Sequence, residues 1–215
     1  MANTLDTVVL RLQAGDVTLQ IEQIEQLSSL ATESLRAGTD PYWAYLWPSA
    51  RALVQHIGQS DVDFSGLNVL EIGAGLGAPG LLAAARGARV TATDGREEAL
   101  DLITANAERN GLDVQVRQLD WSAPPEDLDT FDLILASDVL YDDGMLRTVL
   151  RFTKRALAQQ GALWLADPER IPASGIRGAA ILSGLETESR VLVPGQTLTG
   201  GVSLHVLRRR ARRFG

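Results

Sequence analysis

A glycine-rich run directly after a short apolar segment is the strongest chemical signal in this chain. It reads Leu70-Glu-Ile-Gly-Ala-Gly-Leu-Gly77, with Ala78 next. Glycines that follow a strand let backbone N–H groups approach a ligand closely, and a helix N-terminus comes directly after them. The spacing Gly73-x-Gly75-x-x-Ala78 also fits a dinucleotide fingerprint or a tight structural turn, so the loop alone leaves its ligand open.

Glu71 lies inside the apolar segment, two residues before the first glycine. A dinucleotide site usually carries an apolar residue at this position. A buried carboxylate requires hydrogen-bond donors, and we expect the backbone amides of the glycine loop to supply them. Glu71 therefore argues against a plain dinucleotide site.

Acidic and aromatic residues end the next three apolar segments. Asp94 is placed to accept hydrogen bonds from ribose hydroxyls, a role that NAD sites share, or to cap the helix that follows. Asp120-Trp121 combines a carboxylate with a flat ring, which suits the edge and face of an adenine but also an ordinary turn. In Ser137-Asp138-Val-Leu-Tyr141 a carboxylate and a phenol lie just past a strand end and face the mouth of a cleft. Taken alone, that pair also fits a helix cap and a half-buried ring.

Short apolar strands alternate with helical stretches from residue 68 onward, and these elements must position the site. Strands are expected at Asn68–Ile72, Arg89–Thr93, Val114–Leu119, Phe131–Ala136 and Ala162–Ala166, and helices at Ala78–Arg86, Glu97–Asn110 and Gly144–Ala158. This alternation predicts parallel βαβ units. Leu185–Val193 and Gly201–Arg208 add an antiparallel hairpin. We predict an α/β fold with a doubly wound, mostly parallel seven-strand sheet (Rossmann-like), which binds ligands at the carboxyl ends of its strands.

The first forty residues form a small N-terminal extension with a different pattern. Val8–Gln13 and Val17–Ile21 alternate apolar and polar residues, as a hairpin does. Apolar residues between Ile21 and Leu35 recur at helical spacing and predict a helix. Ser49 is expected to cap a further helix that runs to about Ile57. We predict one domain over residues 1–215, with the extension at 1–40 and the core at 41–215.

The amino-acid composition excludes several kinds of binding site and catalytic group. The 215 residues are 45% hydrophobic and include no cysteine, which excludes disulfides, thiolate zinc sites, Fe–S clusters and cysteine nucleophiles. No cluster of His, Asp and Glu has metal-ligand spacing, so we predict no metal, and His56 and His205 are interpreted as structural. No apolar run reaches the roughly 18 residues of a membrane helix, and the start does not resemble a secretory signal. We predict a cytoplasmic protein without a membrane partner.

Charge is distributed unevenly along the chain. Lys+Arg is 20 and Asp+Glu is 27, giving −7. Five arginines lie in Arg208–Arg213, so the remainder carries 15 − 27 = −12. An acidic body binds phosphate backbones poorly, which argues against nucleic acid as a partner, and it suits a basic protein surface.

Together these residues resemble the S-adenosylmethionine-dependent seven-strand methyltransferases, in the branch that holds small protein-lysine methyltransferases and nicotinamide-N-methylase-like proteins. The resemblance rests on Leu46-Trp-Pro-Ser49, the glycine run, Asp94, Asn106 to Gly111, Asp120-Trp121, Ser137-Asp-Val-Leu-Tyr141 and Asp167-Pro-x-Arg170. Pro41-Tyr-Trp-Ala and the last motif look most like bacterial relatives of the electron-transfer-flavoprotein β-subunit lysine methyltransferase. That enzyme typically has glycines after its Trp-Pro, where this chain has Ser49-Ala50.

The resemblance implies S-adenosyl-L-methionine as the cofactor and assigns a role to each matching residue. Asp138 and Tyr141 would be catalytic, facing the methyl group and the incoming nucleophile. The cofactor would be held by Trp47, Glu71, Gly73, Ala74, Gly75, Asp94, Asp120, Trp121 and Ser137. The expected acceptor is an amine, foremost a lysine on a basic segment of a protein substrate, and we favour a monomer.

Three alternatives stay open. An NAD-dependent oxidoreductase would use the same glycine loop, but the chain has no Tyr-x-x-x-Lys pair, since its one lysine, Lys154, follows Thr153. A non-catalytic scaffold would bind the cofactor and use the acidic face to hold a partner. A nucleic-acid or small-molecule methyltransferase is favoured only by the arginine tail, and the chain lacks an Asn/Asp-Pro-Pro-Tyr motif.

Overall fold

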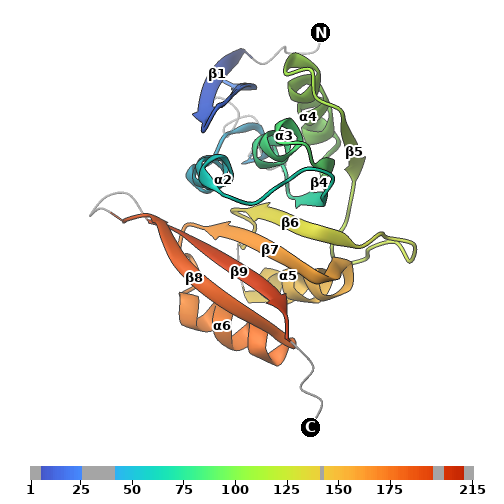
Figure 1. Ribbon diagram of the computed structural model, residues 1–215, viewed down its shortest axis with the longest axis vertical. Coiled ribbons are helices and arrows are strands. Elements are labelled where there is room, and N and C mark those ends of the chain that lie inside the picture. The colour runs from blue at the N-terminus through green and yellow to red at the C-terminus, as the bar shows by residue number, and fades with distance from the viewer. Residues whose placement is uncertain (1–5, 26–41, 141–142, 196–200, 211–215) are drawn as a thin grey trace, which may run out of the picture.

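Seven strands form one central sheet in the computed structural model, which describes residues 6–25, 42–140, 143–195 and 201–210 (Figure 1). The sheet order is β5-β4-β3-β6-β7-β9-β8. The parallel strands are β3 (Asn68–Ile72), β4 (Arg89–Asp94), β5 (Val114–Gln118), β6 (Phe131–Ser137) and β7 (Leu157–Asp167). The last two strands, β8 (Leu185–Val193) and β9 (Val202–Arg209), are antiparallel, and β9 lies between β7 and β8. The predicted fold class is confirmed.

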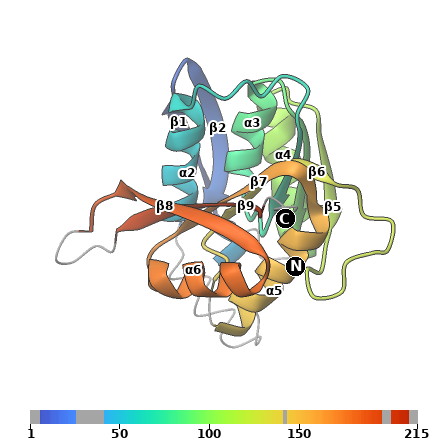
Figure 2. The same cartoon turned by 60° about the horizontal axis from the view of Figure 1, so that its bottom comes forward.

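Helices cover both faces of the sheet (Figure 2). One face carries α2 (Pro48–Gln59), α3 (Ala78–Ala85) and α4 (Glu97–Arg109), and the other carries α5 (Asp143–Ala156) and α6 (Ala173–Leu182). The central strands are therefore apolar on both sides: Val69 packs into the cluster of α2 and α3, and Leu70 into that of α5 and α6. The chain passes from β3 outward to β5 and then returns to β6 on the other side of β3. This reversal is a topological switch point, where such sheets bind ligands.

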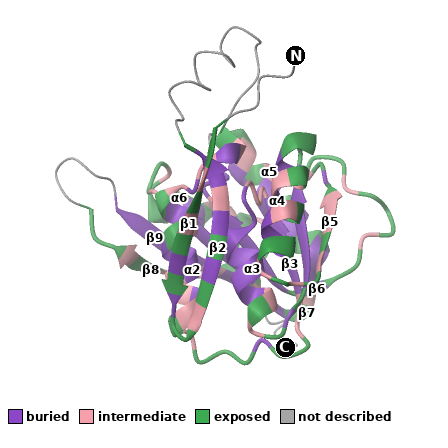
Figure 3. Ribbon diagram, turned by 90° about the horizontal axis from the view of Figure 1, so that it is seen from above, coloured by how far each residue is buried: buried purple, intermediate pink, exposed green. Residues whose placement is uncertain are grey.

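The N-terminal hairpin is a separate two-stranded sheet, β1 (Thr7–Ala14) and β2 (Val17–Ile24), which packs outside α2, α3 and α4 (Figure 3). Leu12 and Ile21 are buried in the same apolar cluster as α2 and α3. The predicted hairpin is confirmed. The helix expected from Ile21 is wrong at its start, because Ile21–Ile24 belong to β2, and its remaining residues lie outside the described part of the chain.

Two further local predictions are corrected, and one helix was not predicted. Trp47 occupies the N-cap of α2 and Pro48 its first position, so Ser49 lies inside the helix, where its buried hydroxyl has no hydrogen-bond partner among the described residues. Strand β7 begins at Leu157, five residues earlier than expected, directly after α5 ends. Helix α6 has no counterpart among the predicted elements.

No helix in the described part of the chain has the length and apolar character needed to cross a bilayer.

Candidate active site

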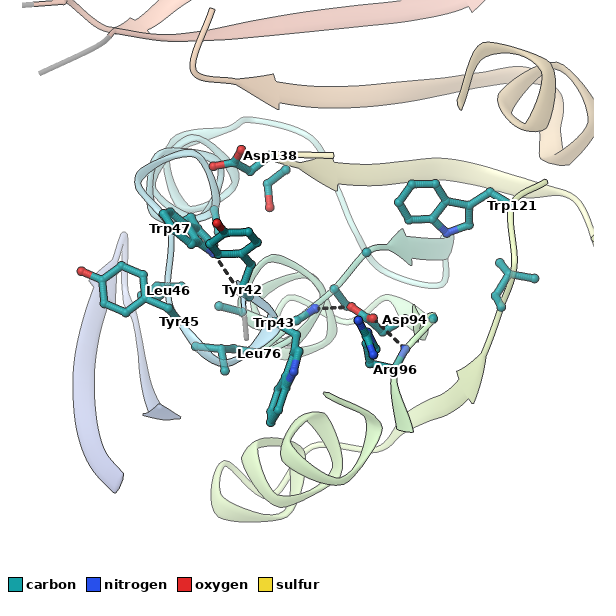
Figure 4. A pocket seen from close by; sticks show the side chains of 18 of the residues that line it. Tyr42, Trp43, Tyr45, Leu46, Trp47, Leu76, Asp94, Arg96, Trp121 and Asp138 are labelled. Carbon is teal, nitrogen blue, oxygen red and sulfur yellow. Dashed lines mark hydrogen bonds between the residues drawn. The ribbon is translucent and has the colours of Figure 1, made fainter. Parts of the chain in front are cut away.

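A cavity of about 830 Å³ opens at the carboxyl ends of β3, β4 and β6 (Figure 4). Of the predicted site residues that the structure describes, all but Glu71 line it, namely Trp47, Gly73, Ala74, Gly75, Asp94, Asp120, Trp121, Ser137 and Asp138. Tyr141 lies outside the described residues. Residues from five separate segments of the sequence therefore meet at one place.

The glycine loop between β3 and α3 approaches the cavity with its backbone. Gly73, Gly75 and Gly77 have positive φ angles of 59°, 55° and 75°, which residues with a Cβ rarely adopt. A Cβ on Gly75 would lie 2.9 Å from the carbonyl oxygen of Trp43. Glycine is therefore required here both by the conformation and by the close approach of the covering segment.

Asp94, the last residue of β4, is bound to that loop. Its Oδ2 accepts the N–H of Gly75 at 2.9 Å, and its Oδ1 accepts the N–H of Arg96 at 3.0 Å. The residue is only 8% exposed. Backbone donors thus fix a carboxylate at the cavity wall, where its remaining lone pairs can accept hydrogen bonds from the hydroxyl groups of a ligand.

Glu71 supports the loop from beneath and does not reach the cavity. Its Oε2 accepts the N–H of Gly80, in the first turn of α3, at 2.9 Å. The donor is therefore a helix amide, whereas the sequence had suggested the loop amides. Burial, with a further contribution from the charge of Asp94, raises the pKa of Glu71 to about 8, so the carboxyl group is protonated at neutral pH.

Asp120 and Trp121 form the wall beyond β5. The carboxylate of Asp120 accepts the N–H and hydroxyl of Ser122, at 2.8 and 2.6 Å, and these bonds lower its pKa. The Trp121 ring packs on the loop: a Cβ on Gly73 would lie 3.0 Å from its Cζ2. The indole Nε1–H is buried without a hydrogen-bond partner among the described residues. A flat ring with an unpaired donor suits a planar ligand with acceptor atoms.

Aromatic side chains cover the opposite side of the cavity (Figure 4). Trp47 donates its Nε1–H to the carbonyl oxygen of Tyr42 at 2.7 Å. Its ring makes edge contacts with Tyr42 and Tyr45, at centroid distances of 5.6 and 5.3 Å. These rings come from the short 3₁₀ helix η1 (Tyr42–Ala44) and the residues before α2. Such rings can offer aromatic faces to a cation.

Asp138 follows β6 at the mouth of the cavity with a φ of 60°. Its N–H donates to the carbonyl oxygen of Ala166 at 2.9 Å, and its Oδ1 accepts a hydrogen bond from Nη1 of Arg170. Arg170 lines the same cavity and had no role assigned from the sequence. The motif Asp167-Pro-x-Arg170 was a signal, but nothing local indicated that it meets a residue of another strand.

Asp167 completes this group. Its Oδ1 accepts the N–H of Arg170 at 3.0 Å, and its Oδ2 is buried without a hydrogen-bond partner among the described residues. Burial is the main cause that raises the pKa of Asp167 to about 6. Neither histidine lines the cavity: His205 is buried beside Ser189, and the ring of His56 packs against that of Trp164 at a tilted angle. Over the described residues, no group of three or more His, Cys, Asp or Glu could hold a metal ion.

Known proteins resemble the chain in sequence and in fold. Residues 35–174, more than half of the chain, match a family described as lysine methyltransferase. The chain is 41% identical over 108 residues to protein N-lysine methyltransferase METTL21A of Danio rerio, covering 46% of this chain and 48% of the relative. It is 37% identical over 120 residues to histone-arginine methyltransferase METTL23 of Rattus norvegicus, covering 51% of each. The chain thus spans about half the length of these relatives.

A solved structure extends the likeness over most of the fold. Magnesium protoporphyrin IX methyltransferase of Synechocystis PCC 6803 with bound SAM has a TM-score of 0.61 and 16% identity, covering 85% of this chain and 92% of that chain. At this identity the likeness is one of fold.

Proposed function

Because the chain belongs to the lysine methyltransferase family, we propose that it transfers a methyl group from S-adenosylmethionine to a lysine side chain of a protein. The observation that carries the proposal is the meeting of the glycine loop, Asp94 and Trp121 with Asp138 in one cavity under an aromatic cover. The NAD-dependent alternative shares only the loop and Asp94 with this set, and neither the family match nor the relatives support it.

The residues present fit this cofactor. Gly73 and Gly75 let the loop pack closely against Trp121 and Trp43, where a Cβ would clash, and Asp94 offers a fixed carboxylate to ribose hydroxyls. The unpartnered Nε1–H of Trp121 and the flat face of its ring suit an adenine. Ser137 would lie beneath the cofactor and Trp47 would cover it, while Glu71 holds the first turn of α3 in place.

Bound S-adenosylmethionine supplies an electrophilic methyl group on a positively charged sulfur that departs as a neutral thioether. The remaining task of the protein is to align the acceptor with that group, which can contribute about 7–11 kcal/mol. We assign the alignment to Asp138 and to the aromatic cover formed by Tyr42, Tyr45 and Trp47. Tyr141 is proposed to face the acceptor as well, on the resemblance alone.

A lysine acceptor must lose a proton before it can attack. An unperturbed lysine has a pKa of about 10.4, so presenting the neutral amine at pH 7 costs about 4.6 kcal/mol. Exclusion of water by the aromatic rings and the positive charge of the cofactor both favour the neutral amine. We propose that Asp138 orients the amine through an N–H and that the proton leaves to water.

The proposed partner is a protein with a basic, lysine-bearing segment, since the chain outside its arginine tail carries −12 (15 − 27). A cytoplasmic location and a monomeric state stay predictions from the sequence. An arginine acceptor is the second candidate, because one of the relatives is named for it.

The test is transfer of a tritiated methyl group into a lysate of the source organism. We expect label in a protein band that acid hydrolysis resolves into methylated lysine, at a rate that rises about tenfold per pH unit above 7. High salt should weaken the transfer by screening the exposed charges. Label in methylated arginine would select the second candidate. Label in nucleic acid or small molecules alone would overturn the proposal.

A further inference from the structure

Arg170 joins the two strand-end turns that border the acceptor side of the cavity. Its main chain is fixed by Asp167, whose Oδ1 accepts the Arg170 N–H at 3.0 Å. Its guanidinium is held by Oδ1 of Asp138. The backbone of Asp138 is tied to the same turn, since its N–H donates to the carbonyl oxygen of Ala166 at 2.9 Å. The fold therefore positions both side chains. That of Arg170 is 41% exposed and that of Asp138 is 9% exposed.

Both ends of this connection have a strained backbone. Over the described residues, Asp138 and Glu169 are the non-glycine residues with positive φ, at 60° and 64°. Such conformations cost energy and persist where the surrounding structure requires them. Glu169 is held by the hydroxyl of Ser203, which donates to its Oε1 at 2.7 Å. The turn that carries Arg170 is thus held in a conformation that brings the guanidinium to Asp138.

We propose that Arg170 is a positioning residue that offsets the charge of Asp138, so that the acceptor amine is bound in its neutral, nucleophilic form. This inference rests on the proposed function, because it concerns the amine acceptor of the same site. It gives a specific task to a residue that does not itself react.

An isolated carboxylate in this place would work against the reaction. It would bind the ammonium form tightly and favour retention of the proton that the amine must lose to water. With Arg170 on Oδ1, the pair has no net charge. Oδ2 makes no hydrogen bond with the described residues and can still accept one N–H from the amine. Orientation is then retained while the attraction for the ammonium form is reduced.

The other charged and titratable groups around Asp138 are the same in the wild type and in a variant at position 170. From the turn after β7 these are Asp167 and Glu169, and from the rest of the cavity they are Asp94, Arg96, Asp120, Tyr42 and Tyr45. Because only residue 170 is changed, a shift in the behaviour of a bound amine reports on the guanidinium.

The experiment uses n-butylamine, labelled with ¹³C next to nitrogen, as the probe. The probe is titrated into protein saturated with S-adenosylhomocysteine, and the carbon shift is followed with pH. In Arg170→Gln we expect the pKa of the bound amine to be about one unit higher than in the wild type, with several-fold tighter binding at pH 7. Arg170→Lys, which retains the charge, should stay within a few tenths of a unit of the wild type.

Arg177→Gln is the matched control, since Arg177 is an exposed arginine of α6 that does not line the cavity. It should leave both the bound pKa and the affinity unchanged. An Arg170→Gln variant with the wild-type bound pKa, or a wild type that does not bind the probe, would overturn the inference. The kinetic counterpart is a lower kcat at pH 7 without a higher KM for the labelled protein. Failure of the proposed function is a separate result: label absent from protein lysine and arginine, whatever the probe shows.

Discussion

Two pairs of acids lie at the carboxyl ends of the sheet, and each pair combines a carboxyl group that lines the cavity with one that does not. In the donor half, formed by β3, β4 and the glycine loop, these are Asp94 and Glu71. In the acceptor half, formed by β6, β7 and the turn to α6, they are Asp138 and Asp167. In both halves burial raises the pKa of the hidden group, to about 8 for Glu71 and about 6 for Asp167.

The halves differ in what holds the carboxylate that lines the cavity. Asp94 is held by the backbone N–H groups of Gly75 and Arg96, which orient it without cancelling its charge. Asp138 is held by the guanidinium of Arg170, which does offset its charge. A full negative charge suits ribose hydroxyls and a cationic cofactor, whereas an offset charge suits an amine that must become neutral. Aspartate therefore serves two different tasks in this site, and the group that holds its carboxylate decides which task.

The halves also reach a left-handed backbone by different means. The donor half uses Gly73, Gly75 and Gly77, which adopt positive φ without strain, whereas the acceptor half has Asp138 and Glu169 at similar angles. Where the backbone itself is presented to the ligand, glycine is suitable. Where a side chain must act, the strain is retained together with the carboxylate.

The largest expected effect separates the halves by function. Asp138→Asn keeps the size of the side chain and tolerates positive φ but removes the charge. Methyl transfer should fall by about 10²-fold or more, the cost of a misplaced acceptor in a site that works by alignment. Calorimetric titration should give a dissociation constant for S-adenosylhomocysteine within a few-fold of the wild type. Lost cofactor binding would instead move Asp138 to the donor half.

Asp94→Ala is the reciprocal change. It removes the acceptor of the Gly75 and Arg96 N–H groups and of the proposed ribose contacts. Charge-assisted hydrogen bonds contribute about 1.5–3 kcal/mol each, so the affinity for S-adenosylhomocysteine should fall about 10- to 100-fold. The same calorimetric titration measures it. Unchanged affinity would show that Asp94 is not a cofactor ligand.

Gly75→Ala tests whether the donor half depends on its backbone. The new Cβ would meet the carbonyl oxygen of Trp43 at 2.9 Å, at a φ of 55°. We expect the cofactor affinity to fall about tenfold, with a loss of unfolding free energy of about 1–2 kcal/mol. Gly111→Ala is the control, since its φ is 64° but nothing lies within 4 Å of a Cβ there. The Gly111→Ala variant should lose stability but keep the wild-type affinity for the cofactor.

The two hidden carboxyl groups predict a pH dependence of stability in separate windows. Glu71 has an ordinary value of 4.5 and a folded pKa of about 8, so the folded protein binds more protons between these values than the unfolded chain does. The free energy of unfolding should therefore fall as pH rises, by up to about 1.4 kcal/mol per unit. For Asp167 the window runs from 3.8 to about 6.

Denaturant titrations across pH would distinguish the two groups. Glu71→Gln should flatten the dependence between pH 6 and 8, and Asp167→Asn should flatten it only below pH 6. An unchanged slope above pH 6 in Glu71→Gln would contradict the assignment of that window.

The sequence predicts the donor half better than the acceptor half for a physical reason. The glycine loop follows the buried strand β3, Asp94 ends the buried strand β4, and Trp121 comes shortly after the half-exposed strand β5. Their meeting at one sheet edge therefore follows from the topology. The contact of Arg170 with Asp138 joins turns after two different strands, and no local pattern indicates it.

Some local sequence patterns led to wrong predictions, because the same pattern fits two different structures. Ser49 is a good capping residue, but Pro48 fits the first helical position and moves the cap to Trp47. Helix α6 contains Gly175 and Gly178, which lower helix propensity and hid it. The spacing of Ile21 and Ile24 suits a helix, yet pairing with β1 makes that segment a strand.

The smallest expected effect concerns the strain at Asp138. Asp138→Gly and Asp138→Ala both lose the carboxylate and the contact with Arg170, so they differ only in how the residue tolerates a φ of 60°. Glycine should be the more stable by about 1 kcal/mol, which corresponds to about 2–4 °C in Tm for a domain of this size. At Asp101, an exposed position inside α4, the same pair should show the opposite order, because alanine favours a helix by about 1 kcal/mol over glycine. Thermal unfolding of the four variants measures both differences. Equal stability of the two variants at position 138 would mean that the turn relaxes once the carboxylate is gone, and that the strain exists only to hold Asp138 against Arg170.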